Sequence, residues 1–557
     1  MATATCRPRA AAAAEMHVGV VRRPAHRPGA HLGAAGVGAR PLTGGCSAEA
    51  NSGVRHIDLF PLHREPLMAR PAPRADRSFV PLTSRTRRFP TMSLRTAQQY
   101  RDGLVDGRRV YYRGERVPDV TTHPELRSAV DHSAHCFSIA ADLPDLAVRE
   151  DAEIGDHSAF YHLPRTAEDL RARGSLIEEV SRRGAGTIVL KEVGSDALFA
   201  LLRATEGDGL ANARAFYDRC RREDLALAVA QTDVKGDRSL GPSQQADPDL
   251  YLRVVDSDAE SITVRGAKTH TSFSANADEI VVLPTRAMGP GDADWAVSFA
   301  VPVDTPGLSL YVSPYLAGER DGFGFPISSR HKLLESLTVF DDVRIPRDRV
   351  FLDRRPELAG PLAIAFVDYH RFTAINYKLP LLDLLVGAAH LVAEANGITR
   401  AGHVRDKIAR LIAWAETVRG LAELSALRAR EGAQGVWLPD PLTVNTAKYT
   451  FAHGYHEAAA TLVDLAGGLL ATGPGVEDWE SPGIRPVLEK YYAAAVPAEQ
   501  RLRILNLVGD ITARDYGGYQ SVLATHAEGS LEAEKMQIAR SFDAGPAIDY
   551  VRGLAGL

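Results

Sequence analysis

The sequence has few cysteines and no long hydrophobic run. Its 557 residues include only Cys6, Cys46, Cys136 and Cys220, which are scattered and form no Cys-x-x-Cys pair. Scattered thiols argue against a disulfide-rich secreted domain and predict a reducing compartment, the cytoplasm. No stretch of about 18 uninterrupted apolar residues occurs, which argues against a transmembrane helix. We therefore expect a soluble cytoplasmic protein.

Lysine is absent from residues 1–91, and acidic residues are scarce there. This leader holds 14 Arg and 5 acidic residues, a net charge of +9, so the rest of the chain carries −14. An acidic body disfavours a role in binding nucleic acid or a membrane surface. The leader is rich in Ala, Gly and Pro without a sustained period, which predicts disorder and argues against the amphipathic helix of a transit peptide. Such a composition is also typical of translated GC-rich upstream DNA, so we expect the native start at Met92.

The spacing of apolar and turn residues divides the body into three regions. Residues 92–227 show helical spacing, except for a two-strand element at 109–117, and predict an N-terminal α-helical domain. Residues 228–350 contain β-branched runs separated by turn residues, which predict a β domain. Residues 351–557 predict a C-terminal helical bundle. Its long helices are expected at 363–396, 401–431, 443–470 and 486–507.

Several strings in this body resemble one flavoprotein superfamily. They are RTAQQYRDGLVDGRRVYYRGERVPDVTTHPELR, TDVKGDRSLGPSQQADPDLYLRVV, ITVRGAKTHTSFSANADEIVVLP, WAVSFAVP and VFDDVRIPRDRVFL. The superfamily groups the oxygenase component of 4-hydroxyphenylacetate 3-monooxygenase with 4-hydroxybutyryl-CoA dehydratase, and the resemblance covers residues 95–557. It implies an α+β multidomain fold like that of acyl-CoA dehydrogenases, with a β-barrel domain between two helical domains. It also implies FAD in a cleft between the β domain and the bundle, and a homotetramer.

The expected flavin site has a physical basis in the turn at residues 231–238. Flavin phosphates need cationic donors and backbone N–H groups, and this turn concentrates both. No GxGxxG motif and no Walker loop is present to supply another nucleotide site. The resemblance places the flavin contacts on Gln231, Thr232, Asp233, Lys235, Gly236, Asp237, Arg238, His270, Thr271 and Ser272. Without it, the turn is interpreted as solvated and residues 270–272 as part of an edge strand.

The dehydratase branch carries an iron–sulfur cluster, and its ligand positions can be followed in this chain. By resemblance, its Cys-x3-Cys pair falls on Ile188 and Glu192, its histidine on His370 and its last cysteine on Tyr377. Three of the four ligands are therefore replaced. Thiolates supply most of the binding of such a cluster, so we expect no iron–sulfur cluster and no other metal site.

The hydroxylase branch holds its phenol with an Arg, a Tyr and a His, and these residues are also replaced. By resemblance, their positions fall on Val193, Ala197 and Val229. Together with Tyr377, these small apolar residues predict a roomier pocket for a larger aromatic or otherwise electron-rich substrate. The replacements argue against 4-hydroxyphenylacetate itself as the substrate.

His370, Arg371 and Lys378 are the catalytic residues that we expect. On a helix, Tyr377 lies about 20° from His370 and Lys378 about 80° from it, so these side chains can face one cleft. A histidine there can act as a general base or bind a substrate oxygen. The alternative is an interfacial histidine beside an arginine that pairs with an acid such as Asp368.

Three functions remain open. We favour a two-component monooxygenase that receives FADH2 from a separate flavin reductase and, with O2, hydroxylates or epoxidises a small molecule through a flavin C4a-hydroperoxide. The absence of a nicotinamide-binding fingerprint fits an external reductase. The alternative is a redox-neutral flavoenzyme, a Δ-isomerase or dehydratase-like enzyme without the cluster, that acts on an acyl-CoA or carrier-bound thioester. A flavin-binding scaffold without catalysis is a third possibility, which the retained flavin turn argues against.

Overall fold

The computed structural model describes residues 94–314 and 318–557. The leader at 1–91, with its expected disorder, and the expected start at Met92 lie outside the described residues. Of the helices in the described ranges, none is both long and apolar enough to span a lipid bilayer.

The first part of the described chain is mainly helical. The first helix begins after Thr96 and has a capping box. The Thr96 hydroxyl accepts from the N–H of Gln99, and the side-chain oxygen of Gln99 accepts from the N–H of Thr96. The elements are α1 (Ala97–Gly103), β1 (Val110–Tyr112), β2 (Glu115–Val117), α2 (Arg127–Ser133), α3 (His135–Asp142), α4 (Pro144–Ala147), β3 (Val148–Arg149), β4 (His157–Ser158), α5 (Ala167–Arg183), α6 (Leu190–Ala204) and α7 (Gly207–Glu223). The predicted short helix and the two-strand element are both present.

The central part of the chain forms strands. They are β5 (Leu227–Ala230), β6 (Arg253–Ser257), β7 (Ser261–Ser272), β8 (Glu279–Val282), β9 (Val297–Pro302), β10 (Leu308–Val312), β11 (Glu335–Pro346) and β12 (Val350–Asp353). One sheet has the order β2-β1-β10-β11-β7-β6 and the other the order β12-β9-β8-β5. Both sheets therefore end in unpaired edges, and the closed β-barrel that we expected is wrong. The four-residue strand β5 packs against helix α6 instead of pairing with a further strand.

The two-strand element at 110–117 belongs to the larger sheet. β1 pairs in parallel with β10, with Val110 opposite Leu310, and β2 forms the outer edge. Its burial pattern alone does not show this pairing, because the partner strand lies far away in the sequence. The first region, expected to be helical apart from this element, therefore contributes two strands to the larger sheet.

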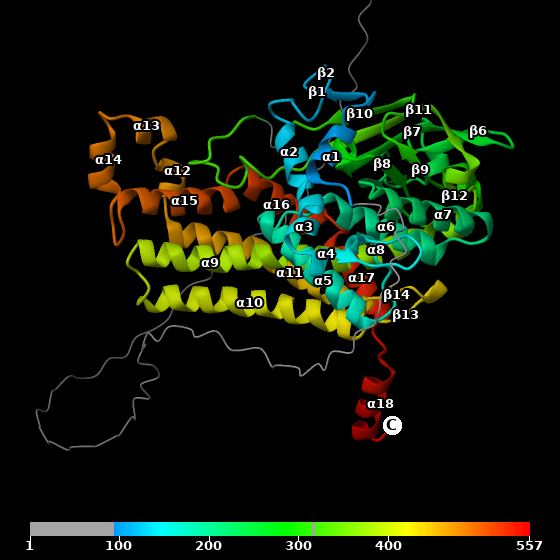
Figure 1. Cartoon of the computed structure of the whole chain (residues 1–557). Helices are drawn as coiled ribbons and strands as arrows, with labels where there is room; N and C mark the ends of the chain where they lie inside the picture. The colour runs from blue at the N-terminus through cyan, green and yellow to red at the C-terminus, as the bar shows by residue number, and fades with distance from the viewer. Residues whose placement is uncertain (1–93, 315–317) are drawn as a thin grey trace, which may run out of the picture. The chain divides into compact units, whose positions relative to one another are not determined.

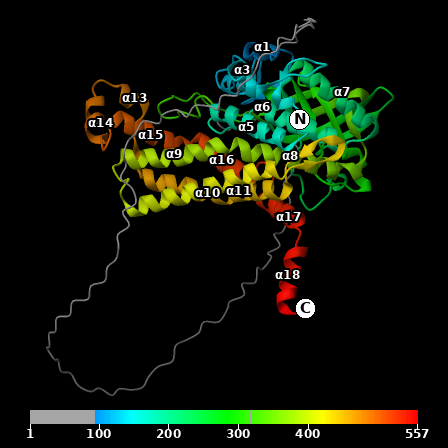
Figure 2. The same cartoon turned by 60° about the horizontal axis from the view of Figure 1, so that its bottom comes forward.

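The last part of the described chain is helical. Its elements are α8 (Pro356–Tyr377), α9 (Leu379–Ala395), α10 (Gly402–Leu427), β13 (Arg430–Glu431), β14 (Trp437–Leu438), α11 (Pro441–Ala466), α12 (Leu469–Thr472), α13 (Val476–Glu480), α14 (Arg485–Tyr492), α15 (Ala498–Thr512), α16 (Asp515–His526), α17 (Leu531–Ser541) and α18 (Gly545–Ala555). Helices α9, α10 and α11 run side by side (Figures 1 and 2).

The helix expected at 363–396 is in fact two helices. Lys378 ends α8 and begins α9, and Pro380 stands in the first turn of α9. Proline lacks an N–H and disfavours a helical conformation of the residue before it, so it breaks the periodic segment here. The helix expected at 486–507 is likewise divided, with α15 beginning after Pro497.

Helix α8 lies between the two main hydrophobic clusters. Phe366 and Tyr369 belong to the cluster that includes the sheets and α6, while Phe372 and Ile375 belong to the cluster of the bundle. A helix that is apolar on opposite sides is buried along most of its length. The polar residues of α8 are therefore enclosed by protein unless they reach a cleft.

A buried ion pair joins α6 to the end of α7. Lys191 Nζ lies 2.5 Å from Asp224 Oδ1, and the two side chains are 1% and 4% exposed. Asp224 caps α7 with a left-handed backbone, φ 50°. The Lys191 ammonium also lies 3.8 Å from the centre of the Phe137 ring. Removing either charge would leave the other buried without its partner.

We expect Asp224→Asn to lower the free energy of unfolding by about 3–5 kcal/mol, because it leaves the Lys191 charge unpaired in the core. Asn tolerates a left-handed backbone, so the substitution tests the charge and not the turn. Denaturant unfolding followed by circular dichroism measures the loss. The control is Glu489→Gln, in the exposed pair of Arg485 and Glu489, which should change stability by less than about 0.5 kcal/mol. Equal effects of the two substitutions would contradict the prediction.

Candidate functional site

His370 lies on α8 with one ring nitrogen bonded and the other free. Its Nδ1 is 3.1 Å from Oδ2 of Asp196, and its ring stacks on Phe366 with centroids 4.9 Å apart. Its side chain is 16% exposed, whereas Asp196 is fully buried. Among the described residues, no group forms a hydrogen bond with Nε2 of His370. That nitrogen is therefore available to a ligand.

Asp196 is held by two further helices. Its Oδ1 accepts from Nη2 of Arg173 on α5, at 2.7 Å, and from Oγ1 of Thr373 on α8, at 2.8 Å. Arg173 also donates to Oγ of Ser195 and to the backbone oxygen of Phe160. The carboxylate that bonds His370 is thus fixed by a buried cation and a hydroxyl.

A second polar cluster surrounds Glu528, in the turn between α16 and α17. Lys378 Nζ lies 3.0 Å from its Oε2, and the Tyr377 hydroxyl donates to its Oε1. Lys448 Nζ lies 3.7 Å from Oε2 on the other side. Glu528 has a φ of 55°, which costs energy for a residue with a side chain, so these contacts hold it in place.

The charges in this cluster shift one another's ionisation. Burial lowers the pKa of Lys378 to about 8, although Glu528 attracts its charge. Burial of the Glu528 carboxyl opposes its ionisation, but Lys378, Lys448 and then His370 outweigh it and lower its pKa to about 2. Glu528 is therefore a carboxylate at neutral pH, and it lies within electrostatic reach of His370.

Arg371 supports the Glu528 turn. Its Nε donates to the backbone oxygen of Glu528 at 2.8 Å, and its Nη1 donates to Oδ1 of Asn445 on α11. Asp368, the acid that we considered as its partner, pairs instead with Arg203 at 2.9 Å. The structure thus brings Lys378 and Tyr377 into contact with Glu528 and places Arg371 against the backbone of the same turn. His370 lies within electrostatic reach of Glu528.

The two segments expected to bind flavin lie against each other. Thr269 N donates to the backbone oxygen of Thr232 at 2.9 Å. Lys268 Nζ lies 2.5 Å from Oδ1 of Asp233 and 3.0 Å from the backbone oxygen of Gln231. Lys268, which the sequence interpretation missed, therefore fixes the start of the turn to β7.

The rest of the turn is held by Gln245. Its Oε1 accepts from the N–H of Asp237 at 3.0 Å, and its Nε2 donates to the backbone oxygen of the same residue at 2.9 Å. Gly236 has a φ of +49°, and a Cβ there would stand 2.5 Å from Oε1 of Gln245. Only glycine fits this close approach without displacing the Gln245 side chain from its two hydrogen bonds with Asp237.

Positive charge gathers around this turn. Burial, followed by the nearby Arg238 and Arg286, lowers the pKa of Lys235. Partial desolvation, followed by the charges of Lys235 and His526, lowers the pKa of His270. Cations that repel one another in this way are typical of a site for an anionic group.

Polar atoms without partners lie at the same segments. Within the described ranges, the buried Oγ1 of Thr271 and Oδ2 of Asp233 have no hydrogen-bond partner. Buried polar atoms are normally satisfied, so orphaned ones suggest a missing ligand or water. Together with the cations, these atoms fit a phosphate-bearing cofactor with polar ring atoms.

Ser272 connects the sheet to the C-terminal helices. Its Oγ lies 2.9 Å from both carboxylate oxygens of Glu335, and the Tyr519 hydroxyl on α16 lies 2.5 Å from Oε1. Burial raises the pKa of Glu335. Glu335 and Tyr519 were also missed, because they become neighbours of Ser272 only in the folded chain.

The residues expected to line a substrate pocket are packed in the core. Val193 and Ala197 on α6, Val229 on β5 and Tyr377 on α8 are all buried, Ala197 completely. They belong to the large hydrophobic cluster that includes the sheets, α6 and part of α8. A substrate pocket at these residues stays a prediction.

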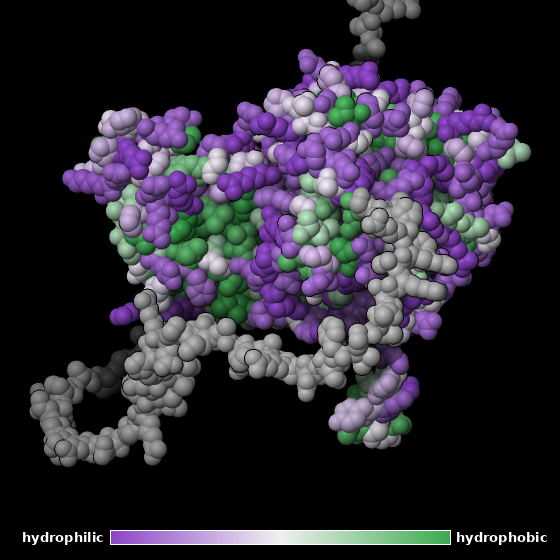
Figure 3. All heavy atoms as spheres, viewed as in Figure 1, coloured by the Kyte–Doolittle hydropathy of each residue, from purple (hydrophilic) through white to green (hydrophobic). Residues whose placement is uncertain are grey.

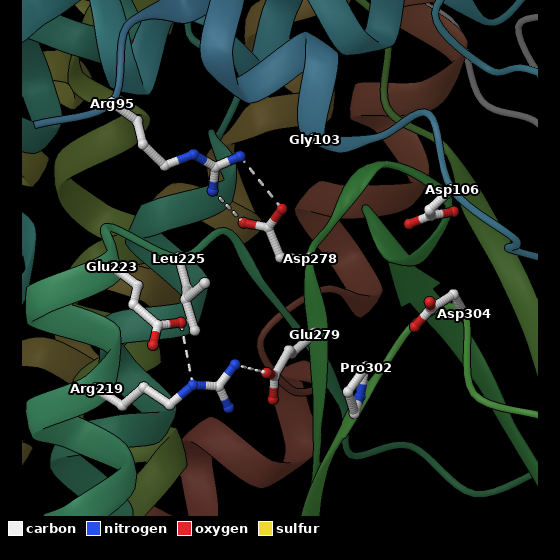
Figure 4. Close-up of a pocket in the computed structure, with 10 residues that line it drawn as sticks. All are labelled: Arg95, Gly103, Asp106, Arg219, Glu223, Leu225, Asp278, Glu279, Pro302 and Asp304. Carbon is white, nitrogen blue, oxygen red and sulfur yellow. Dashed lines mark hydrogen bonds and ion pairs between the residues drawn. The ribbon is translucent and has the colours of Figure 1, made fainter.

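A cavity of about 440 Å³ lies elsewhere. Figure 4 shows its lining, in which Arg95 pairs with Asp278 at 2.5 Å and Arg219 pairs with Glu279 at 2.7 Å. None of the expected site residues lines it. Both of its arginines already pair with lining carboxylates, so the residues around His370 are the better candidate for chemistry.

The positions on which the resemblance places the cluster ligands of the dehydratase branch make other contacts in this chain. Glu192 accepts from the N–H of Val189 at 3.0 Å and from Oγ of Ser181 at 3.1 Å, and so caps α6. Burial raises its pKa to about 8, which favours the neutral acid. Tyr377 is bonded to Glu528. In the part of the chain that the structure describes, no group of three or more His, Cys, Asp and Glu side chains could hold a metal ion.

Comparison with known proteins gives relatives over most of the chain. Residues 96–352 match the family described as 4-hydroxyphenylacetate 3-hydroxylase N terminal, and residues 359–556 match the corresponding C-terminal family. The chain is 32% identical to the 4-hydroxybutyryl-CoA dehydratase/vinylacetyl-CoA-Delta-isomerase of Clostridium aminobutyricum, over 83% of this chain and 100% of that protein. It is 30% identical to the oxygenase component of 4-hydroxyphenylacetate 3-monooxygenase of Thermus thermophilus, over 77% of this chain and 90% of that one.

A solved structure is also similar over the same region. It is a crystal structure of the oxygenase component of 4-hydroxyphenylacetate 3-monooxygenase in complex with FAD and 4-hydroxyphenylacetate. The TM-score is 0.78 at 28% identity, and the match covers 83% of this chain and 98% of that chain. These comparisons confirm the resemblance expected from the sequence strings.

We expect stability to depend on pH through Glu528. Its folded pKa, about 2, lies below the ordinary value of 4.5, so its ionisation stabilises the fold above pH 4.5 and this gain is lost as the pH falls. Between about pH 5 and pH 3, the wild-type free energy of unfolding should fall by roughly 1–2 kcal/mol more than that of Glu528→Gln. Denaturant unfolding at each pH measures both. Glu532→Gln, at an exposed pair with Lys535, is the control and should follow the wild type. Parallel curves for wild type and Glu528→Gln would contradict the assignment.

Proposed function

The chain belongs to the 4-hydroxyphenylacetate 3-hydroxylase family, and on this basis we propose that it is a flavin-dependent monooxygenase acting on an aromatic or other electron-rich small molecule. One observation carries the choice between the two branches of the family. At the positions of the dehydratase thiolates, Glu192 is a buried helix cap and Tyr377 is bonded to Glu528. Neither side chain is free to bind iron, which removes the support for cluster-dependent dehydration.

We propose that FAD is the cofactor and that residues 231–238 and 270–272 hold it. Lys235 and Arg238 supply positive charge for its phosphates, and the unpartnered Oγ1 of Thr271 supplies a polar contact. Lys268 and Gln245 preorganise the turn by the contacts described above. When bound and reduced, FAD supplies the activation of O2. The reduced form would come from a separate flavin reductase.

In this proposal, His370 acts on the substrate through Nε2. This nitrogen is free, while Nδ1 is bonded to Asp196, so the ring can accept a proton from a substrate hydroxyl or bind its oxygen. Lys378 and Glu528 form a pair of charges, and Glu528 lies within electrostatic reach of His370. Their contribution is a constant local field in an enclosed site, where charges act more strongly than in water.

The second candidate is a redox-neutral reaction on an acyl thioester. It is favoured by the 32% identity to the Clostridium enzyme, which extends over the whole of that protein. A Δ-isomerisation needs a proton to leave one carbon and return to another, and the free nitrogen of His370 could carry it. Such a reaction consumes no O2, which separates the two candidates experimentally.

We expect isotope labelling to distinguish these functions. The purified full chain is loaded with FAD, reduced, and mixed with 18O2 and a panel of phenols that includes 4-hydroxyphenylacetate and bulkier analogues. A monooxygenase gives a product that carries one 18O atom, detected by mass spectrometry. Conversion of vinylacetyl-CoA without O2 uptake would instead establish the second candidate. A Lys235→Ala/Arg238→Ala variant should bind FAD more weakly and give proportionally less product, whereas Arg485→Ala should behave as wild type.

We further propose that the protein is a homotetramer in which α18 packs on another copy. Large apolar residues on α18 are exposed, among them Tyr550, Val551 and Leu554. Figure 3 shows green, apolar surface over the helical bundle as well. Exposed apolar surface of this kind is typical of an interface between subunits.

Removing residues 543–557 should lower the oligomeric state, because it removes the apolar face of α18. Light scattering after size exclusion measures the mass of the full chain and of the shortened chain. Val551→Asp/Leu554→Asp should have the same effect with the helix retained, whereas Asp549→Ala on the same helix should not. The proposal is wrong if the full chain is monomeric or if the shortened chain keeps the full-length oligomeric state.

A further inference from the structure

The hydrogen bond between His370 and Asp196 determines which nitrogen of His370 is free. An ionised carboxylate only accepts hydrogen bonds, so Nδ1 of His370 must carry the proton that it shares with Oδ2 of Asp196. In the neutral ring, Nε2 is then an acceptor. Phe366 stacks on the ring and limits its rotation. A ring turned over would present the wrong nitrogen to a substrate.

We propose that Asp196 is a positioning residue for His370: it fixes the tautomer and orientation in which Nε2 faces a substrate. This inference rests on the proposed catalytic role of His370. Asp196 contacts no substrate itself, because its side chain is fully buried. It acts through the one hydrogen bond to His370.

The two oxygens of Asp196 have separate partners. Oδ1 takes the bonds from Arg173 and Thr373, whereas Oδ2 takes the bond from His370. Side chains from α5 and α8 therefore hold the carboxylate independently of its hydrogen bond with His370. A carboxylate bonded on only one side could rotate about its own axis, and the imidazole would follow it.

Arg173 has a second effect on the site. Its guanidinium stays charged at neutral pH and lies 2.7 Å from Asp196. Arg173 holds the Asp196 carboxylate through Oδ1, which leaves Oδ2 to His370.

The burial of Asp196 alone does not show whether it positions His370 or only stabilises the fold. The buried Arg173–Asp196 pair also joins α5 to α6, so its loss would weaken the fold whatever His370 does. A role through His370 differs in one respect, since it disappears when His370 is absent. This difference can be measured.

The test is a double-mutant cycle with wild type, Asp196→Asn, His370→Ala and the combined variant, assayed for kcat and KM with the substrate found by isotope labelling. We expect Asp196→Asn to lower kcat about 10- to 100-fold with KM nearly unchanged, because the ring loses its orientation. In the His370→Ala background, the same change should lower kcat less than about twofold. An equal factor in both backgrounds would overturn the proposal, since Asp196 would then act through the fold.

A second set of variants keeps the test valid if Asp196→Asn prevents folding by leaving Arg173 without its partner. All four proteins are also made with Arg173→Met, which removes the buried cation, and the same non-additivity is expected. Added imidazole should partly restore the activity of His370→Ala but not that of the Asp196→Asn/His370→Ala variant, because only Asp196 can orient it. Equal rescue in both would also overturn the proposal.

Failure of the proposed function gives a different result. If wild type incorporates no 18O but isomerises the thioester, the monooxygenase assignment fails, while the cycle can still be run on that reaction. If His370→Ala keeps full activity, His370 has no catalytic role and the proposal for Asp196 falls with it. FAD content and melting temperature, measured on every variant, show whether a loss of kcat reflects loss of the cofactor or of the fold.

Discussion

The buried contact between Arg173 and Asp196 is the interaction on which the polar interior of this protein depends. It joins helices α5 and α6, and through Thr373 and His370 it also joins α8, the helix between the two hydrophobic clusters. A charge this deep in a protein is costly unless it has a partner of opposite sign, and here each of the two charges supplies that partner to the other. The packing of three helices and the orientation of the histidine therefore have a common cause.

Much of the secondary structure follows from the local spacing of apolar and turn residues, whereas the pairing of strands depends on contacts between segments far apart in the sequence. The helices and strands were placed largely correctly because apolar period and turn residues are local properties. The pairing of β1 with β10 and the open edges of the two sheets depend on contacts between distant segments. The break at Lys378 was visible in Pro380 but was outweighed by the helical spacing of apolar residues on both sides of it.

The candidate site was open to sequence reasoning to a similar extent. The resemblance singles out His370 and Lys378; Lys378 pairs with Glu528, and Glu528 lies within electrostatic reach of His370. Their catalytic role stays a prediction. Glu528 itself gave no signal, because it lies 150 residues from Lys378 in the sequence. Asp196 did give one: a single acidic residue in the apolar stretch VGSDALFALL indicates a buried charge that must have a partner. Only the folded structure identifies that partner.

The parallel pairing of β1 with β10 also constrains how the chain folds during synthesis. The hydrogen bond from Arg109 to the backbone oxygen of Leu308 spans 199 residues of sequence. During synthesis, β1 therefore cannot pair with β10 until most of the intervening chain has been made. Ordering contacts of such high sequence separation is slow, and an unpaired strand edge meanwhile invites association with other chains. The N-terminal region alone is thus a poor candidate for an independently folding fragment.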